Sequence, residues 1–191
     1  MKNRFVLLIV FVLILPSFSS FAQEMDMQEM MKVWMEYMTP GQMHEMLAKN
    51  IGTWNTSTTF WNYPGAEPAT SEGTAVMESI LGGRFFKTVH HSTVMGMPME
   101  GWSIDGYDNG KKVFMSIWID NMGTGLAQSF GSYDNATSTF NHIGTMYDAM
   151  ADRDVEFRSV TKMIGENKMI FEMYADFQGQ EFKMMEMVYT R

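Results

Sequence analysis

Turn signals recur along the chain after residue 50, and this recurrence limits the possible fold more than any other feature of the sequence. Glycine, asparagine, aspartate and proline gather at 64–65, 81–83, 95–98, 108–110, 121–123, 134–135, 165–167 and 178–180. The segments between these turns alternate with period two and are rich in Val, Ile, Thr, Phe, Tyr and Trp. Short strands separated by short turns are typical of an antiparallel up-and-down sheet.

The pattern predicts about ten strands, at 51–62, 70–80, 84–95, 98–107, 111–120, 124–134, 138–147, 154–163, 168–177 and 181–190. No helical stretch separates them, so parallel crossovers are excluded. An open sheet of this width would expose two long edges, which closure removes. Short successive turns favour a barrel over a Greek-key sandwich, for which only 63–69 and 148–153 are long enough to cross. We therefore predict an all-β, antiparallel up-and-down barrel over residues 51–191.

Asp108-Asn109-Gly110 is the strongest hairpin signal of this barrel, because Asn-Gly favours a tight primed turn.

Residues 1–22 have the composition of a signal peptide. Lys2 and Arg4 precede an apolar run at 5–15. The small residues Ser20 and Ala22 stand at the two positions that a signal peptidase inspects for cleavage before Gln23. The run is shorter than the roughly 20 residues of a spanning helix. The chain has no cysteine, which excludes disulfide bonds and cysteine-ligated metals. We expect a periplasmic or secreted protein of a Gram-negative bacterium.

Residues 23–50 form a methionine-rich segment with helical spacing. One stripe of a 3.6-residue repeat contains Met27, Met30, Met31, Trp34 and Met38. Pro40 disfavours helical geometry at Thr39, so a second short helix is predicted after the break, with Thr39 as its N-cap. We expect these helices to cap one end of the barrel or to dock on its wall.

The charge balance limits the partners. The chain has 14 basic and 22 acidic residues and a formal net charge of −8, and loss of Lys2 and Arg4 would make it more negative. An acidic surface repels phosphate backbones and anionic lipids, so neither nucleic acid nor membrane insertion is expected. The oligomeric state is not indicated.

Several short motifs resemble those of known barrel proteins. Gly52-Thr53-Trp54 at the head of the first strand resembles the lipocalin and wider calycin barrels. The resemblance implies that the tryptophan closes the floor of the barrel and packs beneath an arginine from the last strand. Gly52, Trp54 and Arg191 are then the barrel-closure residues of this chain, and a guanidinium stacked on an indole contributes about 0.5–2 kcal/mol.

A second resemblance covers most of the chain. The sequence is similar to a bacterial family known as domain of unknown function 1579, for which the resemblance implies a calycin-like barrel and no established reaction. It rests on Gly52-Thr53-Trp54 together with 81–85, 95–101, 106–109, 118–120 and 189–191. The methionine-rich segment departs from that family's pattern.

The interior of such a barrel is the main candidate site. A barrel of eight to ten strands either fills with side chains or encloses a small apolar ligand. The leading hypothesis is a small hydrophobic or amphipathic molecule bound in the lumen, and a packed, ligand-free lumen is the alternative. The parity of the strands that faces inward is not fixed by the sequence. Candidate ligand-binding residues are Trp102, Trp118, His142, Phe140 and Glu100.

Two further hypotheses stay open. An enzyme would use His142 or His90 with a lumenal carboxylate, although no catalytic motif is present. A Cu(I)-binding or protein-interaction module would use the methionines, because soft thioethers prefer Cu(I). The candidate copper ligands are Met25, Met27, Met95 and Met97. Haem held by a single histidine such as His142 is a further possibility, and no cofactor is predicted for the leading hypothesis.

Overall fold

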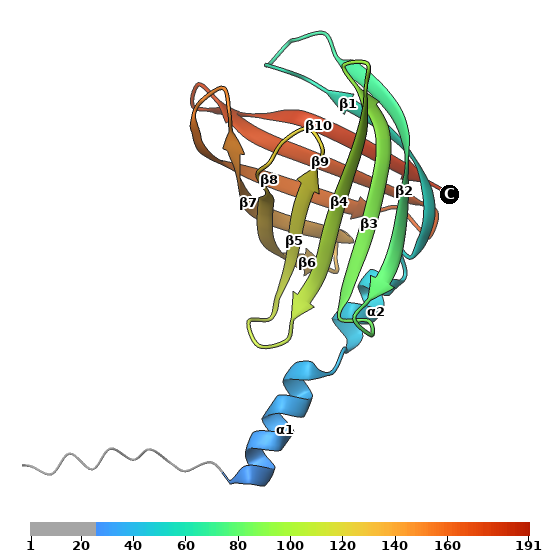
Figure 1. The fold of residues 1–191 in the computed structure, drawn as a ribbon, viewed down its shortest axis with the longest axis vertical. Helices are drawn as coiled ribbons and strands as arrows, with labels where there is room; N and C mark the ends of the chain where they lie inside the picture. Colours follow the sequence, from blue (N-terminus) through green and yellow to red (C-terminus); the bar gives the residue numbers. More distant parts are fainter. Residues whose placement is uncertain (1–25) are drawn as a thin grey trace, which may run out of the picture.

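The chain forms a closed barrel of ten antiparallel strands preceded by two short helices (Figure 1). The structure is a computed structural model that describes residues 26–191, so the predicted signal peptide and Met25 lie outside the described residues. The helices are α1 (Met27–Met38) and α2 (Gln42–Ala48). The strands are β1 (Gly52–Phe60), β2 (Ala69–Ile80), β3 (Phe85–Val94), β4 (Met97–Asp108), β5 (Val113–Asp120), β6 (Ala127–Asp134), β7 (Thr139–Asp148), β8 (Arg153–Met163), β9 (Lys168–Phe177) and β10 (Gln180–Thr190).

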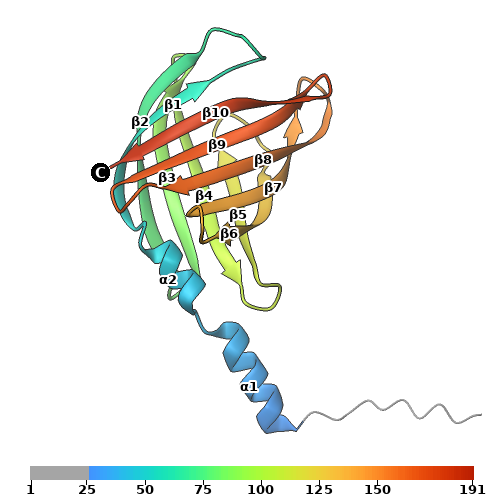
Figure 2. The same ribbon diagram turned by 180° about the vertical axis from the view of Figure 1, so that it is seen from behind.

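The strands follow one another around the barrel in chain order, which confirms the predicted up-and-down topology. The ring closes where β1 pairs with β10, from Asn55 opposite Thr190 to Phe60 opposite Met185. Strands β2 to β5 run along one wall, and β7 to β10 cross behind them (Figures 1 and 2). Because every strand has a neighbour on both sides, the sheet has no free edge.

Cross-strand pairing shows which residues face the interior. Trp54 pairs with Ala75, Ala75 with His90, and His90 with Gly101, and all four are buried. Residues opposite one another on paired strands lie on the same face of a sheet, and the faces alternate along each strand. The inner face therefore carries the odd-numbered residues of β4 and the even-numbered residues of β3 and β5.

Helix α2 closes one end of the barrel, at the bottom of Figure 1. Leu47 is buried in a cluster with Phe86, Phe114 and Phe140, which come from three different strands. Met43 and Met46 pack against the same cluster. The expectation that a helix of the methionine-rich segment caps the barrel thus holds for α2, whose apolar side covers the inner side chains at the base.

The start of α2 differs from the prediction. Its N-cap is Gly41 and not Thr39, and the imidazole Nδ1 of His44 accepts a hydrogen bond from the Gly41 backbone N–H at 3.1 Å. Thr39 instead ends α1, where its hydroxyl donates to the Met35 carbonyl at 2.6 Å. A hydroxyl that bonds back to the preceding turn is not available to cap the next helix.

Helix α1 extends away from the barrel, and none of its residues is buried. The helices were expected to cap the barrel or to dock on its wall, but the side chains of the stripe from Met27 to Met38 are exposed. The contact that holds α1 is made by Asn109, whose side-chain amide donates to the carbonyls of Glu36, Tyr37 and Thr39. Neither α1 nor α2 is long and apolar enough to cross a membrane, within residues 26–191.

The β4–β5 turn is present where Asp108-Asn109-Gly110 predicted it, but it is not a tight two-residue turn. Four residues, 109–112, connect the strands, and the positive φ of 55° falls on Lys112. The Asp108 carboxylate accepts hydrogen bonds from the backbone N–H groups of Gly110 and Lys111 at 2.8 and 3.0 Å. An aspartate that satisfies two loop amides stabilises this longer turn.

Trp54 and Arg191 meet at the junction of the first and last strands. The guanidinium carbon of Arg191 lies 4.2 Å from the centre of the Trp54 ring. Its nitrogens donate to the carbonyls of Lys49, Ile51 and Glu166 at 2.8–3.2 Å. Gly52 lies against this guanidinium and has a φ of +133°, so a side chain there would be strained and would press on Arg191.

The Arg191 contacts should contribute measurably to stability. We expect Arg191→Ala to lower the free energy of unfolding by about 1–3 kcal/mol, since it removes the stacking on Trp54 and several hydrogen bonds. Arg191→Lys should recover only part, because an ammonium lacks the planar fork. Urea unfolding measures the change. Arg153→Ala, at the exposed start of β8, is the control, and an equal loss in both alanine variants would contradict this role.

Candidate ligand-binding lumen

The inner face of the barrel is unusually polar in its middle. Thr56, Thr58, Thr88, Ser129 and Ser159 are buried and belong to the inner set by their pairing. Below this level, α2 and the aromatic cluster close the base. Hydroxyl groups inside a closed barrel provide hydrogen-bonding positions without charge, so the middle of the lumen suits a ligand with a polar part.

Some inward-facing side chains are only partly buried. Asp105 and Tyr189 face the interior by their pairing, and their side chains are only partly buried by area. An inward-facing side chain keeps accessible area where neighbouring protein atoms do not cover it completely. The two residues lie on β4 and β10, with β1, β2 and β3 between them around the ring. The interior is therefore incompletely filled at this level.

Asp105 is the centre of the polar part of the lumen. It pairs with Phe86 on one side and Ser116 on the other. The Ser103 hydroxyl donates to its carboxylate at 2.8 Å, and the Ser116 hydroxyl donates to it as well. Burial raises the pKa of Asp105, and these two hydrogen bonds offset part of the rise. Burial also raises the pKa of Tyr189, and the charge of Asp105 adds to the effect.

His90 faces the interior from β3, opposite Gly101. Its ring centre is 5.1 Å from that of Trp118 and 6.0 Å from that of Tyr189. It is 95% buried by area, and its Nδ1 has no hydrogen-bond partner within residues 26–191. Burial lowers the pKa of His90 to about 4, and the neighbouring His91 adds to the decrease, so the ring is neutral at pH 7.

His142 faces the interior from β7, opposite Ser159 and Gly131. Burial lowers its pKa to about 4 as well. In the part of the chain that the structure describes, neither His90 nor His142 is hydrogen-bonded to a carboxylate. The acid–base pair that the enzymatic hypothesis needs is thus not formed by these side chains.

The part of the inner face that belongs to β8, β9 and β10 is apolar. Phe171 pairs with Met187, Met173 with Met185, and Met163 with Met169. Phe171, Met173 and Met185 keep partly accessible side chains although they point inward. Methionine side chains adapt to irregular shapes, so this wall can accommodate an apolar group without one fixed outline.

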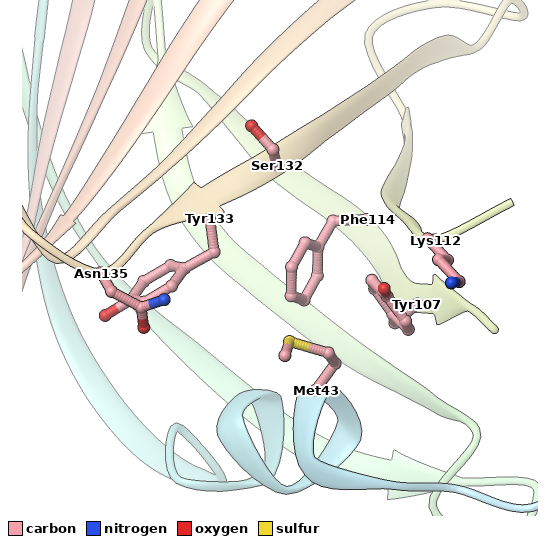
Figure 3. Close-up of a pocket in the computed structure, with 7 residues that line it drawn as sticks. All are labelled: Met43, Tyr107, Lys112, Phe114, Ser132, Tyr133 and Asn135. Carbon is pink, nitrogen blue, oxygen red and sulfur yellow. The ribbon is translucent and has the colours of Figure 1, made fainter.

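Two hollows are open to solvent. The first, about 180 Å³, lies between α2 and the base of the barrel, where Met43 faces Phe114, Tyr107 and Tyr133 (Figure 3). The second, about 560 Å³, is lined mainly by outward residues of β5 to β8, including Phe130, Ile143 and Arg158. Neither contains Asp105 or Tyr189, so both differ from the internal space.

The structure divides the predicted ligand-binding residues into two groups. Trp118, His142 and Phe140 belong to the inner face, although Phe140 is buried against the base cluster. Trp102 and Glu100 lie on the outer wall, so their predicted lumenal position is wrong. The Trp102 indole N–H donates to the Glu100 carboxylate at 2.8 Å, and the Lys87 ammonium lies 5.0 Å from the Trp102 ring centre. A cation and a carboxylate keep this indole on the solvent side.

The candidate copper ligands do not gather in one place. Met95 and Met97 are exposed at the β3–β4 turn, and Met27 is exposed on α1. Met25 lies outside the described residues. Within residues 26–191, no group of three or more His, Asp or Glu side chains is arranged to hold a metal ion.

The sequence-based selection missed Asp105 and Tyr189. Asp105 stands near the end of a predicted strand, where aspartate is commonly explained by turn chemistry, and Tyr189 entered only as part of the 189–191 motif. A signal was available: Ser103, Asp105 and Tyr107 share one strand parity with Gly101. Once Gly101 is known to face His90, all three point inward.

These features define a class of protein: a closed up-and-down barrel with one end covered by a helix and a partly polar interior. The chain belongs to the family described as "Protein of unknown function (DUF1579)", whose model matches residues 39–191. No curated protein matches the chain.

A solved structure shows the same fold. The chain is similar to Rv2717c from M. tuberculosis, with 13% sequence identity and a TM-score of 0.60, over 80% of this chain and 99% of that one. It also matches EF1p2_mFAP2b bound to DFHBI, with 10% identity and a TM-score of 0.41, over 78% of this chain and 99% of that one.

The buried histidines should make the fold sensitive to acid. Their pKa is about 4 in the folded protein against a usual 6.5, so the unfolded chain binds more protons between these values. We therefore expect the free energy of unfolding to fall as the pH decreases from 6.5 to 4, by up to about 3 kcal/mol per histidine. Urea unfolding at a series of pH values measures this decrease.

Adjacent histidines provide a matched comparison for this prediction. His90→Gln should flatten the pH dependence, while His91→Gln, whose side chain is 57% exposed, should leave it unchanged. The raised pKa of Asp105 acts in the opposite direction, because protonation of that carboxyl favours the folded state. A pH profile equally steep in both variants would show that His90 does not titrate as described.

Proposed function

We propose that this protein is exported and binds a small hydrophobic or amphipathic molecule inside its barrel. The observation that carries the proposal is the accessible surface of inward-facing side chains. Asp105 and Tyr189 face inward and keep accessible area on the polar side, and Phe171, Met173 and Met185 do so on the apolar side. A filled, ligand-free core would bury these side chains completely.

The arrangement matches the chemistry of small-molecule pockets. Such sites are mostly apolar and contain a few polar groups that orient the ligand. Here the apolar wall belongs to β8–β10, and the polar groups come mainly from β3, β4 and β5. Helix α2 covers the base, so a ligand would enter from the opposite end, where the β1–β2 and β3–β4 connections lie (Figure 2).

An uncharged fluorescent probe tests the proposal. The fluorescence of N-phenyl-1-naphthylamine increases in apolar surroundings, so titration with the purified protein should show saturable binding. Thr161→Trp should weaken binding roughly tenfold or more, equivalent to about 1.4 kcal/mol. Thr161 faces inward between Phe140 and Phe171 and is partly accessible. An indole there would occupy the space that the probe needs.

The control is the same substitution on the outer face. Thr145 lies on β7, is exposed, and pairs with Gln128 and Glu156. Thr145→Trp should bind the probe like the unmodified protein. No saturable binding, or equal weakening by both substitutions, would contradict a lumenal site. Circular dichroism of both variants shows whether the barrel remains folded.

A further inference from the structure

The inner face contains an acidic group without a basic partner. The only hydrogen-bond donors to Asp105 from residues 26–191 are the hydroxyls of Ser103 and Ser116. No lysine or arginine of this part of the chain forms an ion pair with it. A carboxylate placed deep in a protein without a cation is costly, so such a group marks a position where a ligand can supply the missing partner.

Four basic side chains of the barrel already have partners elsewhere. Lys87 pairs with Glu78 at 2.8 Å, Arg158 with Glu181 at 2.9 Å, and Lys183 with Glu172 at 2.9 Å, all on the outer face. Arg191 is bound to backbone carbonyls at the base. None of these cations is directed toward the polar part of the lumen, so a ligand carboxylate would meet Asp105 without compensation.

Two further polar atoms of the inner face lack partners. Nδ1 of His90 and the hydroxyl of Thr88 are buried and unpaired within the described residues. Both residues point inward from β3, and Thr88 pairs with Ser103, which itself donates to Asp105. The unpartnered groups therefore lie on the same wall as the carboxylate. Unsatisfied buried polar groups are rare and point to a missing hydrogen-bonding species.

From this cluster we infer that the lumen binds an amphipathic molecule whose polar head is a hydrogen-bond donor, cationic or hydroxylic, and that Asp105 receives this head. The inference rests on the proposed lumenal binding and adds the chemical class of the ligand. An ammonium or hydroxyl head donates to the Asp105 carboxylate, and the apolar tail lies along Phe171, Met173 and Met185. A fatty-acid carboxylate is disfavoured, because two like charges would share one enclosed space.

Competition with matched amphiphiles tests this inference. Dodecylamine, dodecan-1-ol and dodecanoate share one tail and differ in the head. Each would displace N-phenyl-1-naphthylamine from the purified protein at pH 7, below its critical micelle concentration. We expect dodecylamine to compete at concentrations at least roughly tenfold lower than dodecanoate, with the alcohol between them. Equal or stronger competition by dodecanoate would overturn the head-group assignment, although lumenal binding of the probe would stand.

Substitutions separate the carboxylate from general effects. Asp105→Asn keeps the shape and removes the charge, so it should reduce the preference for the amine over dodecanoate about tenfold. Glu78→Gln, which removes an outer-wall carboxylate, should preserve the preference. An unchanged preference in Asp105→Asn would refute the role of Asp105.

Adsorption of the amine to the acidic surface is tested separately. Thr161→Trp narrows the lumen and leaves the outer charges intact, so it should abolish direct binding of dodecylamine measured by calorimetry. Amine binding that persists in this variant would assign the preference to the surface and would overturn the inference.

Two outcomes separate this inference from the proposed function. If the probe itself does not bind the unmodified protein, the proposed function fails together with the head-group assignment. If Asp105→Asn does not fold, the comparison of dodecylamine with dodecanoate on the unmodified protein still decides the question.

Discussion

The pairing of β1 with β10 is the interaction on which the rest of the structure depends. It turns an open sheet into a ring, so that each backbone group along the edges finds a partner and each side chain faces either the interior or the outside. The stacking of Arg191 on Trp54 and its bonds to three carbonyls fasten the ends of the chain at the base of this ring. The strand order, the inner set of residues and the covering by α2 all follow from closure.

The number and order of the strands could be predicted because turn chemistry is local. Proline, glycine and Asx residues mark each turn, and the chain between two such points is long enough for one strand only. The inner face could not be predicted, because β4 and β5 each contain one tryptophan and the two point to opposite faces. Trp102 points outward to Lys87 and Glu100, and Trp118 points inward to His90. Only long-range pairing distinguishes two indoles of similar local sequence.

The errors at the helices have a similar origin. Thr39 is a good N-cap by composition, but its hydroxyl bonds to Met35, and Gly41 begins α2 with the help of His44. Asn109 was assigned to a tight turn, yet its amide serves the carbonyl end of α1, 70 or more residues away in sequence. Side chains with several hydrogen-bonding options are decided by tertiary contacts that local patterns do not contain.

The distribution of polar and apolar residues in the barrel links the fold to its chemistry. The outer wall carries exposed Phe130 and Ile143, whereas Ser129 and Ser159 are buried inside. A barrel stabilised only by core packing would have the reverse arrangement. The interior therefore sacrifices part of the hydrophobic stabilisation for hydrogen-bonding positions, which are concentrated around Asp105 on one side.

The two sides of the lumen differ in how strictly they can select. Asp105 is held by Ser103 and Ser116 on strands that are fixed by their neighbours, so its carboxylate has a defined position and, when ionised, only accepts hydrogen bonds. The opposite wall is made of methionines, whose flexible side chains reshape around apolar groups at low cost. Specificity should thus reside in the head of a bound molecule, while tails of different length or branching are tolerated. A site of this kind suits a set of related amphiphiles that share one polar group rather than a single compound.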